Sequence, residues 1–260
     1  METLGISRVD RGIVRIRLER PEKRNAMSGE MISELAAAAV RFAADQDIRV
    51  VVLSGEGSGF CAGADLEWMR GQFNASQEDR RREAMRLASM LKAWNDLTKP
   101  VIAQVHGCAF GGGLGLIAVS DIAVAAVDTK FAFSETRLGL IPATISPYVA
   151  MRMGEAKMRR VILSARVFGA AEAMELDLVS KVVAEEEIDD AVEEEAAPFL
   201  RCAPGAVAKA KSLARSLGRE IDERVIEESV SRLSECWESD EAHEGITAFF
   251  EKRSPNWLIS

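Results

Sequence analysis

Histidine and tyrosine are scarce in this chain of 260 residues, which contains two His and one Tyr. With so little histidine, no Gly-x-Ser-x-Gly motif and no Cys/His signature, nucleophilic hydrolysis has poor support. A peptidase is therefore a remote alternative. His106 follows a predicted strand and precedes a glycine, which favours a structural or hydrogen-bonding role, and His243 is expected at the surface.

Other signatures are missing too. The four cysteines form no Cys-x-x-Cys pair and no ligand cluster, so we expect reduced thiols, no metal site and a cytoplasmic location. No stretch approaches the roughly 18 uncharged apolar residues of a membrane span, and residues 1–11 lack the apolar run of a signal peptide. The chain has no P-loop, and its glycines do not fit the Gly-x-Gly-x-x-Gly spacing of dinucleotide-binding folds.

The composition is that of a globular protein, with 48% apolar and 28% charged residues. The net charge of −8 argues against nucleic acid as a partner. The length suits one large domain with an appendage. We predict a core over residues 1–200 and a helical assembly region over residues 201–260.

Hydrophobic periodicity predicts an α/β chain that becomes mostly helical after residue 156. Ser28 is the expected N-cap of the first helix. The polar stretch 70–82 is expected to be mobile, and 135–145 irregular. The predicted strands cover 13–18, 49–54, 101–105, 121–126 and 130–133. The predicted helices cover 31–42, 83–97, 113–119, 156–163, 170–176, 188–200, 203–217, 222–237 and 241–252, with another beginning at 146.

Two glycine-rich stretches, 59–66 and 105–116, organise the prediction of function. Each includes or follows a predicted buried strand and leads toward a helical pattern. Small residues let backbone N–H groups approach a ligand, and the first N–H groups of a helix lack internal acceptors. Two such places that face each other would form an oxyanion hole for a carbonyl such as that of a thioester. The alternative is that these glycines only permit close packing of helix on strand.

Glu135 comes directly after an apolar strand. In a dry pocket its pKa would rise, so that it could exchange protons near neutral pH. The alternative is a carboxylate at the rim of the pocket or in a salt bridge. The cations Arg20, Lys23 and Arg24 lie in one polar turn, where they either bind phosphate or are simply solvated.

At these residues the sequence resembles the crotonase (enoyl-CoA hydratase/isomerase) superfamily. The likeness covers nearly the whole chain, in segments 20–27, 59–66, 107–115, 133–142 and 248–253. The resemblance implies a spiral of repeated ββα units with a C-terminal α-helical trimerisation region, in a homotrimer or homohexamer. It also implies an acyl-CoA substrate and no separate cofactor, because coenzyme A is part of that substrate.

The resemblance also implies roles for individual residues. The amides of Ala62 and Gly112 would form the oxyanion hole, and Glu135 would be the acid/base. The acyl-pocket candidates are Trp68, Met69 and Leu140. The implied contacts with coenzyme A come from Lys23, Arg24, Ala64, Asp65 and Leu66, and from Phe249 and Lys252 toward a neighbouring subunit.

One departure from the family pattern is Gly115. Hydratases of the family usually have a glutamate there, two residues after the third glycine of the Gly-Gly-Gly run. Segments 113–116 and 134–147 resemble a bacterial branch assigned to methylglutaconyl-CoA and isohexenylglutaconyl-CoA hydration, which also lacks this glutamate. We expect Gly115 to enlarge the pocket for a branched or carboxylated acyl group. Arg137 would pair with a substrate carboxylate or, the favoured role, form a structural salt bridge.

The leading hypothesis is an enoyl-CoA hydratase-like lyase in which water is positioned by Glu135 alone or by a hydroxyl such as that of Ser134. A double-bond isomerase with a single glutamate is one alternative. A non-catalytic acyl-CoA-binding homologue is another. If the pocket keeps hydratase geometry, Gly115→Glu is expected to raise activity on crotonyl-CoA.

Overall fold

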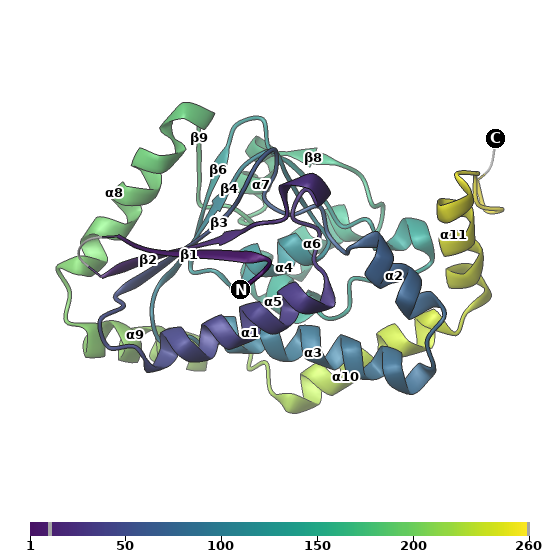
Figure 1. Cartoon of the computed structure of the whole chain (residues 1–260), viewed down its shortest axis with the longest axis horizontal. Helices are drawn as coiled ribbons and strands as arrows, with labels where there is room; N and C mark the ends of the chain where they lie inside the picture. Colours follow the sequence, from purple (N-terminus) through teal and green to yellow (C-terminus); the bar gives the residue numbers. More distant parts are fainter. Residues whose placement is uncertain (10–11, 259–260) are drawn as a thin grey trace.

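The computed structural model describes residues 1–9 and 12–258 and is built around a six-stranded sheet with the order β1-β2-β3-β4-β6-β9 (Figure 1). Only β1 pairs antiparallel with its neighbour; the other pairings are parallel. Strand β1 is absent from the prediction. The strands are β1 (Leu4–Val9), β2 (Ile13–Leu18), β3 (Val50–Gly55), β4 (Val101–Val105), β6 (Ile122–Ala126) and β9 (Lys181–Val183).

A smaller sheet contains β5 (Cys108–Phe110), β7 (Lys130–Ala132) and β8 (Phe168–Gly169). Strands β5 and β7 are parallel, and Cys61 extends the sheet through a parallel bridge to Ala109. The chain therefore alternates between a strand of the large sheet, a short strand of the small sheet and a helix, as predicted. Strand β8 pairs with β7 antiparallel, but because β5 and β7 are parallel, the segments that follow these two strands leave the small sheet at one edge.

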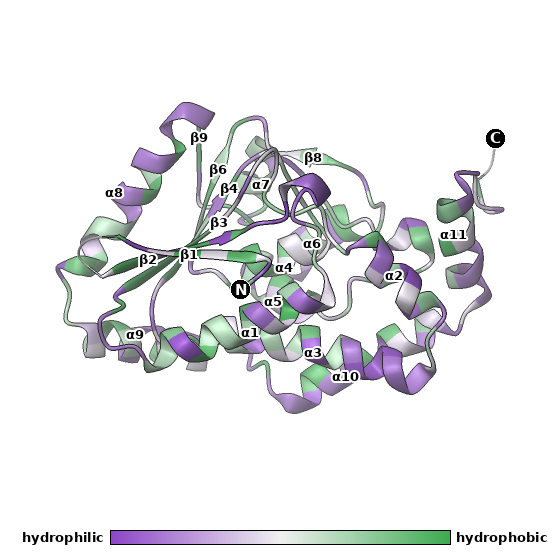
Figure 2. Cartoon of the chain, in the orientation of Figure 1, coloured by the Kyte–Doolittle hydropathy of each residue, from purple (hydrophilic) through white to green (hydrophobic). Residues whose placement is uncertain are grey.

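Helices cover both faces of the large sheet. Along β3, Val51 and Leu53 face the main core while Val50 and Val52 face a second cluster with α8 (Ile188–Leu200), because side chains alternate along a strand. Figure 2 shows β3 hydrophobic along most of its length and α8 largely hydrophilic on its outer surface. A strand covered on both sides reads as a continuous apolar run, which is why the sequence predicts it well.

The main core is closed by α1 (Gly29–Ala44) and α3 (Gln77–Asn95), which run along the same side of the large sheet. The indole of Trp94 donates a hydrogen bond to the Leu35 carbonyl at 2.9 Å and meets the ring of Phe42 edge-on. Ser28 caps α1 as predicted, accepting a hydrogen bond from the Met31 amide.

The polar segment 70–82, predicted to be mobile, is mostly helical. It contains the end of α2 (Leu66–Phe73) and the first turns of α3, which Ser76 caps by accepting a hydrogen bond from the Asp79 amide. Arg80 is buried, pairs with Glu238 and lies over the ring of Trp237. Contacts with a distant helix therefore order a segment whose own composition is polar.

The last two helices lie away from the large sheet, and the last of them is at one end of the molecule (Figure 1). Helix α10 (Glu223–Trp237) packs on α3, and α11 (Asp240–Glu251) packs on the short helix η2 (Glu135–Leu138). The domain boundary at residue 200 and the assembly role stay predictions, and residues 259 and 260 of that range lie outside the described part. The other helices are η1 (Pro21–Lys23), α4 (Gly112–Val119), α5 (Ser146–Met153), α6 (Glu155–Ile162), α7 (Ala170–Glu175), η3 (Glu185–Glu187) and α9 (Pro204–Ser216).

Across residues 1–9 and 12–258, no helix combines the length and the apolar character that crossing a bilayer requires.

Candidate active site

A cavity of about 130 Å³ lies where α2, α4 and η2 begin. Most of its lining is apolar and comes from several helices. The three acyl-pocket candidates Trp68, Met69 and Leu140 all line it, and Trp237 of α10 closes it from the C-terminal region. Among the described residues that line it, Glu135 is the one ionisable side chain.

Glu135 is the first residue of η2, directly after the small sheet. One carboxylate oxygen, Oε2, is buried and has no hydrogen-bond partner among the described residues. Burial raises the pKa of Glu135 from its ordinary value of 4.5 to about 7. The carboxylate can therefore take up and release a proton near neutral pH.

The raised pKa of Glu135 predicts a pH-dependent stability. The folded chain holds this proton up to about pH 7 and the unfolded chain releases it near pH 4.5, so stability falls as pH rises between these values. The difference corresponds to about 3 kcal/mol. We expect Glu135→Gln, which cannot ionise, to be more stable than the wild type at pH 8 by up to about 3 kcal/mol, and the gain to vanish near pH 4.5. Urea unfolding at both pH values measures it; an equal gain at both would contradict the assignment.

The two glycine-rich segments meet beside this carboxylate. A Cβ placed on Gly111 would lie 3.0 Å from Oε1 of Glu135 and 3.7 Å from the Cα of Gly63. A Cβ on Gly63 would lie 3.3 Å from the Phe110 carbonyl oxygen. Both glycines also have positive φ, +46° for Gly111 and +94° for Gly63, which favours glycine. Close approach and backbone conformation thus account for these glycines together.

The assignment of Ala62 to the oxyanion hole is wrong. The Ala62 amide donates a hydrogen bond to the Arg24 carbonyl at 2.9 Å, and Ala62 does not line the cavity. An N–H group that is already bonded within the chain is not available to a thioester oxygen.

Ala64, two residues further on, has the amide that is free. Met27 bonds to the residues on either side of Ala64. Its amide donates a hydrogen bond to the Gly63 carbonyl at 2.7 Å, and its carbonyl accepts one from the Asp65 amide at 3.0 Å. In a parallel bridge the central residue then directs its own N–H away from that partner, and Ala64 lines the cavity. Gly112 lies in the first turn of α4 and also lines the cavity. Within the described residues neither amide has an acceptor.

Asp65, predicted to line the path of coenzyme A, has a structural side chain instead. It is 2% exposed, caps α2 by accepting hydrogen bonds from the amides of Glu67 and Trp68, and forms an ion pair with Arg20 at 2.9 Å. Its carboxylate therefore has its partners within the chain, in the cap of α2 and the ion pair with Arg20.

The other predicted contacts with coenzyme A lie at the surface. Lys23 is 3.6 Å from Glu67 in a partly exposed pair, while Arg24 and Leu66 are exposed. Phe249 and Lys252 are exposed at the end of α11. Their roles stay predictions.

Gly115 does not enlarge the pocket, contrary to the prediction. A Cβ on Gly115 would lie 2.5 Å from Cγ2 of Ile145 and 3.4 Å from Cδ2 of Leu91. Gly115 itself does not line the cavity, whereas Ile145 does. The side chain of Ile145 therefore fills the space that a larger residue at position 115 would need.

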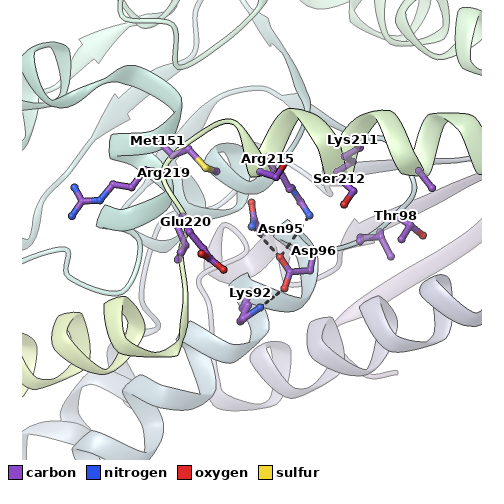
Figure 3. Close-up of a pocket in the computed structure, with 14 residues that line it drawn as sticks. Lys92, Asn95, Asp96, Thr98, Met151, Lys211, Ser212, Arg215, Arg219 and Glu220 are labelled. Carbon is purple, nitrogen blue, oxygen red and sulfur yellow. Dashed lines mark hydrogen bonds and ion pairs between the residues drawn. The ribbon is translucent and has the colours of Figure 1, made fainter.

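A second hollow, of about 470 Å³, lies between the end of α3 and α9 (Figure 3). Its lining is charged, and several of these charged side chains form ion pairs. Asp96 bonds Lys92 and lies 3.6 Å from Arg215, and Lys211 pairs with Asp121. The cavity around Glu135 differs in presenting a buried carboxylate without a counter-ion, which makes it the candidate active site.

The two histidines have the roles predicted for them. The Nε2 atom of His106 lies 2.8 Å from the Gly57 carbonyl oxygen, a hydrogen bond between two distant parts of the chain. His243 is exposed on α11 and meets the ring of Phe73 edge-on.

Comparisons with known proteins show the family to which this chain belongs. A model of the enoyl-CoA hydratase/isomerase family matches residues 8–258. The chain is 33% identical over 237 residues to a probable enoyl-CoA hydratase of Bacillus subtilis (strain 168), covering 90% of each chain. It is 32% identical to a carnitinyl-CoA dehydratase of Proteus mirabilis (strain HI4320), covering 94% of each.

The fold agrees with solved structures as well. The crystal structure of an enoyl-CoA hydratase from Shewanella pealeana matches with a TM-score of 0.81 and 38% identity, covering 98% of this chain and 96% of that one. Together with the family model, this likeness confirms the predicted α/β crotonase fold. The chain is therefore an enzyme of the enoyl-CoA hydratase/isomerase family.

Proposed function

We propose that this enzyme adds water to the α,β double bond of a 2-enoyl-CoA thioester, or removes it in the reverse direction. The observation that carries the proposal is the unpaired, buried carboxylate of Glu135 beside the free amides of Ala64 and Gly112. The relatives named enoyl-CoA hydratase and carnitinyl-CoA dehydratase support a hydro-lyase reaction.

In the proposed mechanism the thioester oxygen accepts hydrogen bonds from the amides of Ala64 and Gly112. These bonds strengthen as the enolate forms, and each donor of this kind contributes about 3 kcal/mol to the transition state. Glu135 takes a proton from water as the water oxygen bonds to Cβ, and it then gives that proton to Cα. A pKa of about 7 makes both forms of the carboxylate accessible at neutral pH.

For the acyl group, we propose an uncharged, branched chain in preference to a glutaconyl-type one. No Lys, Arg or His lines the cavity among the described residues, and Arg137 is exposed, away from the lining and without an ion pair in that part of the chain. A substrate carboxylate would meet Glu135 and apolar walls without a counter-ion from this chain, and such burial is costly. Trp68, Met69 and Leu140 offer an apolar surface to a branched chain instead.

The quaternary structure that the family resemblance implies is also part of the proposal. We propose a homotrimer, or a homohexamer built from two trimers, that forms through the C-terminal helices. Leu213, Leu217 and Phe249 in this region are large apolar side chains with 60%, 80% and 45% exposure, and exposed apolar residues of this kind favour contact with another subunit. Lys23 and Arg24 are proposed to meet the phosphates of coenzyme A.

A panel of 2-enoyl-CoA and 3-enoyl-CoA thioesters with straight, branched and dicarboxylic acyl groups tests the proposed function. We expect mass spectrometry to find 3-hydroxyacyl-CoA formed from uncharged 2-enoyl-CoA, fastest with a branched chain, and little product from dicarboxylic substrates. Bond migration alone would show the isomerase that a single glutamate also permits. Thioester binding without turnover would indicate a non-catalytic homologue.

A further inference from the structure

A second polar group faces the cavity without a partner. Thr144 lines the cavity and is 6% exposed. Among the described residues its hydroxyl forms no side-chain hydrogen bond. The hydroxyl oxygen is not fully buried, because it is absent from the buried side-chain atoms without a partner. Since Thr144 lines the cavity, a water molecule there can bond to this hydroxyl.

The position of Thr144 follows from its neighbour, Ile145. The Ile145 side chain is 2% exposed and packs into the space above Gly115 and beside Leu91. Its carbonyl accepts the amides of Tyr148 and Val149 at the start of α5. The Ser146 hydroxyl donates a hydrogen bond to the Pro142 carbonyl at 2.7 Å, so the chain is anchored on both sides of Thr144. Thr144 is therefore held in place by its neighbours, and it lines the cavity.

We propose that Thr144 positions the water that is added to the substrate, an inference that rests on the proposed hydration reaction. The water bonds to the Thr144 hydroxyl and to Oε2 of Glu135, the buried carboxylate oxygen that has no partner among the described residues. A water needs two to four polar partners to be held in place. During addition its proton goes to Glu135 and its oxygen bonds to Cβ, while the hydroxyl of Thr144 neither gains nor loses a proton. A hydroxyl and a carboxylate thus hold the water together.

Ser134 is the hydroxyl that the sequence suggested for this role. It also lines the cavity, but it is half-buried, so bulk water can satisfy its hydroxyl. Thr144 is more deeply buried, at 6% exposure, and the residue lines the cavity. The structure therefore assigns the role to Thr144.

The test compares Thr144→Val, which removes the hydroxyl at nearly constant volume, with Thr144→Ser, which keeps it. We expect Thr144→Val to lower the kcat of hydration by about ten- to a hundredfold, with KM and the Kd of the unreactive thioester butyryl-CoA within about twofold of wild type. Thr144→Ser should keep kcat within about threefold of wild type. A purely structural role would not produce this separation of kcat from binding, nor this rescue by serine.

The proposal is overturned if Thr144→Val retains full kcat, if Thr144→Ser is as impaired as Thr144→Val, or if Ser134→Ala carries the loss instead. The failures are distinguishable. A wild-type enzyme that hydrates no 2-enoyl-CoA refutes the proposed function and the role of Thr144 with it. A wild-type enzyme that hydrates normally beside an unaffected Thr144→Val refutes the role of Thr144 alone.

Discussion

Glu135→Gln is expected to lower the kcat of hydration about a thousandfold, within the range for loss of a general acid/base group. Glutamine keeps the volume of the side chain but cannot take a proton from water or give one to Cα. The thioester would still meet the amides of Ala64 and Gly112 and the apolar walls of the cavity. The Kd of butyryl-CoA should therefore stay within about threefold of wild type, as measured by isothermal titration calorimetry.

The pH dependence of the wild type provides the control for this prediction. Since burial places the pKa of Glu135 at about 7, kcat/KM should fall on the acid side of about pH 7 as the carboxylate becomes protonated in the free enzyme. The residual activity of Glu135→Gln should lack this limb. A variant with unchanged turnover, or one that keeps the limb, would remove Glu135 from the chemistry.

Much of this site is predictable from the sequence because its signals are local. A valine-rich run predicts β3, and an apolar strand that ends in a carboxylate predicts the buried Glu135. The error at Ala62 arose because the Arg24 carbonyl accepts the Ala62 amide, while Met27 bonds the residues on either side of Ala64, and residues 24–27 lie far away in the sequence. No composition or spacing within the segment reveals which amide is free.

The misinterpretation of Gly115 has the same kind of cause. A glycine in place of a larger residue suggests free space, but the space is occupied by Ile145, thirty positions later and on a different segment. The importance of Thr144 is hidden for the same reason, since its burial depends on how that segment packs. Only a signal that links distant positions, such as correlated substitutions at positions 115 and 145 across relatives, could have revealed this packing.

Gly115→Glu is expected to destabilise the fold by about 2–6 kcal/mol and to leave no hydratase activity on crotonyl-CoA, the opposite of what the sequence alone predicts. A Cβ at position 115 would lie 2.5 Å from Cγ2 of Ile145, so the glutamate side chain would overpack the core, at a cost of about 1–3 kcal/mol. The carboxylate then enters an apolar region, at a further cost of about 1–3 kcal/mol or more. Urea unfolding and the yield of folded protein measure the effect.

The double variant Gly115→Glu with Ile145→Gly separates space from chemistry. Trimming Ile145 removes the atoms that a side chain at position 115 would meet first, so the two changes should be coupled by about 1–3 kcal/mol relative to the sum of the single variants. With room for a second carboxylate beside Glu135, hydration of crotonyl-CoA should exceed that of the single Ile145→Gly variant, which serves as the matched control. Additive losses without any gain of activity would mean that Ile145 is not what excludes a glutamate, and that residues 141–145 shape the cavity in another way.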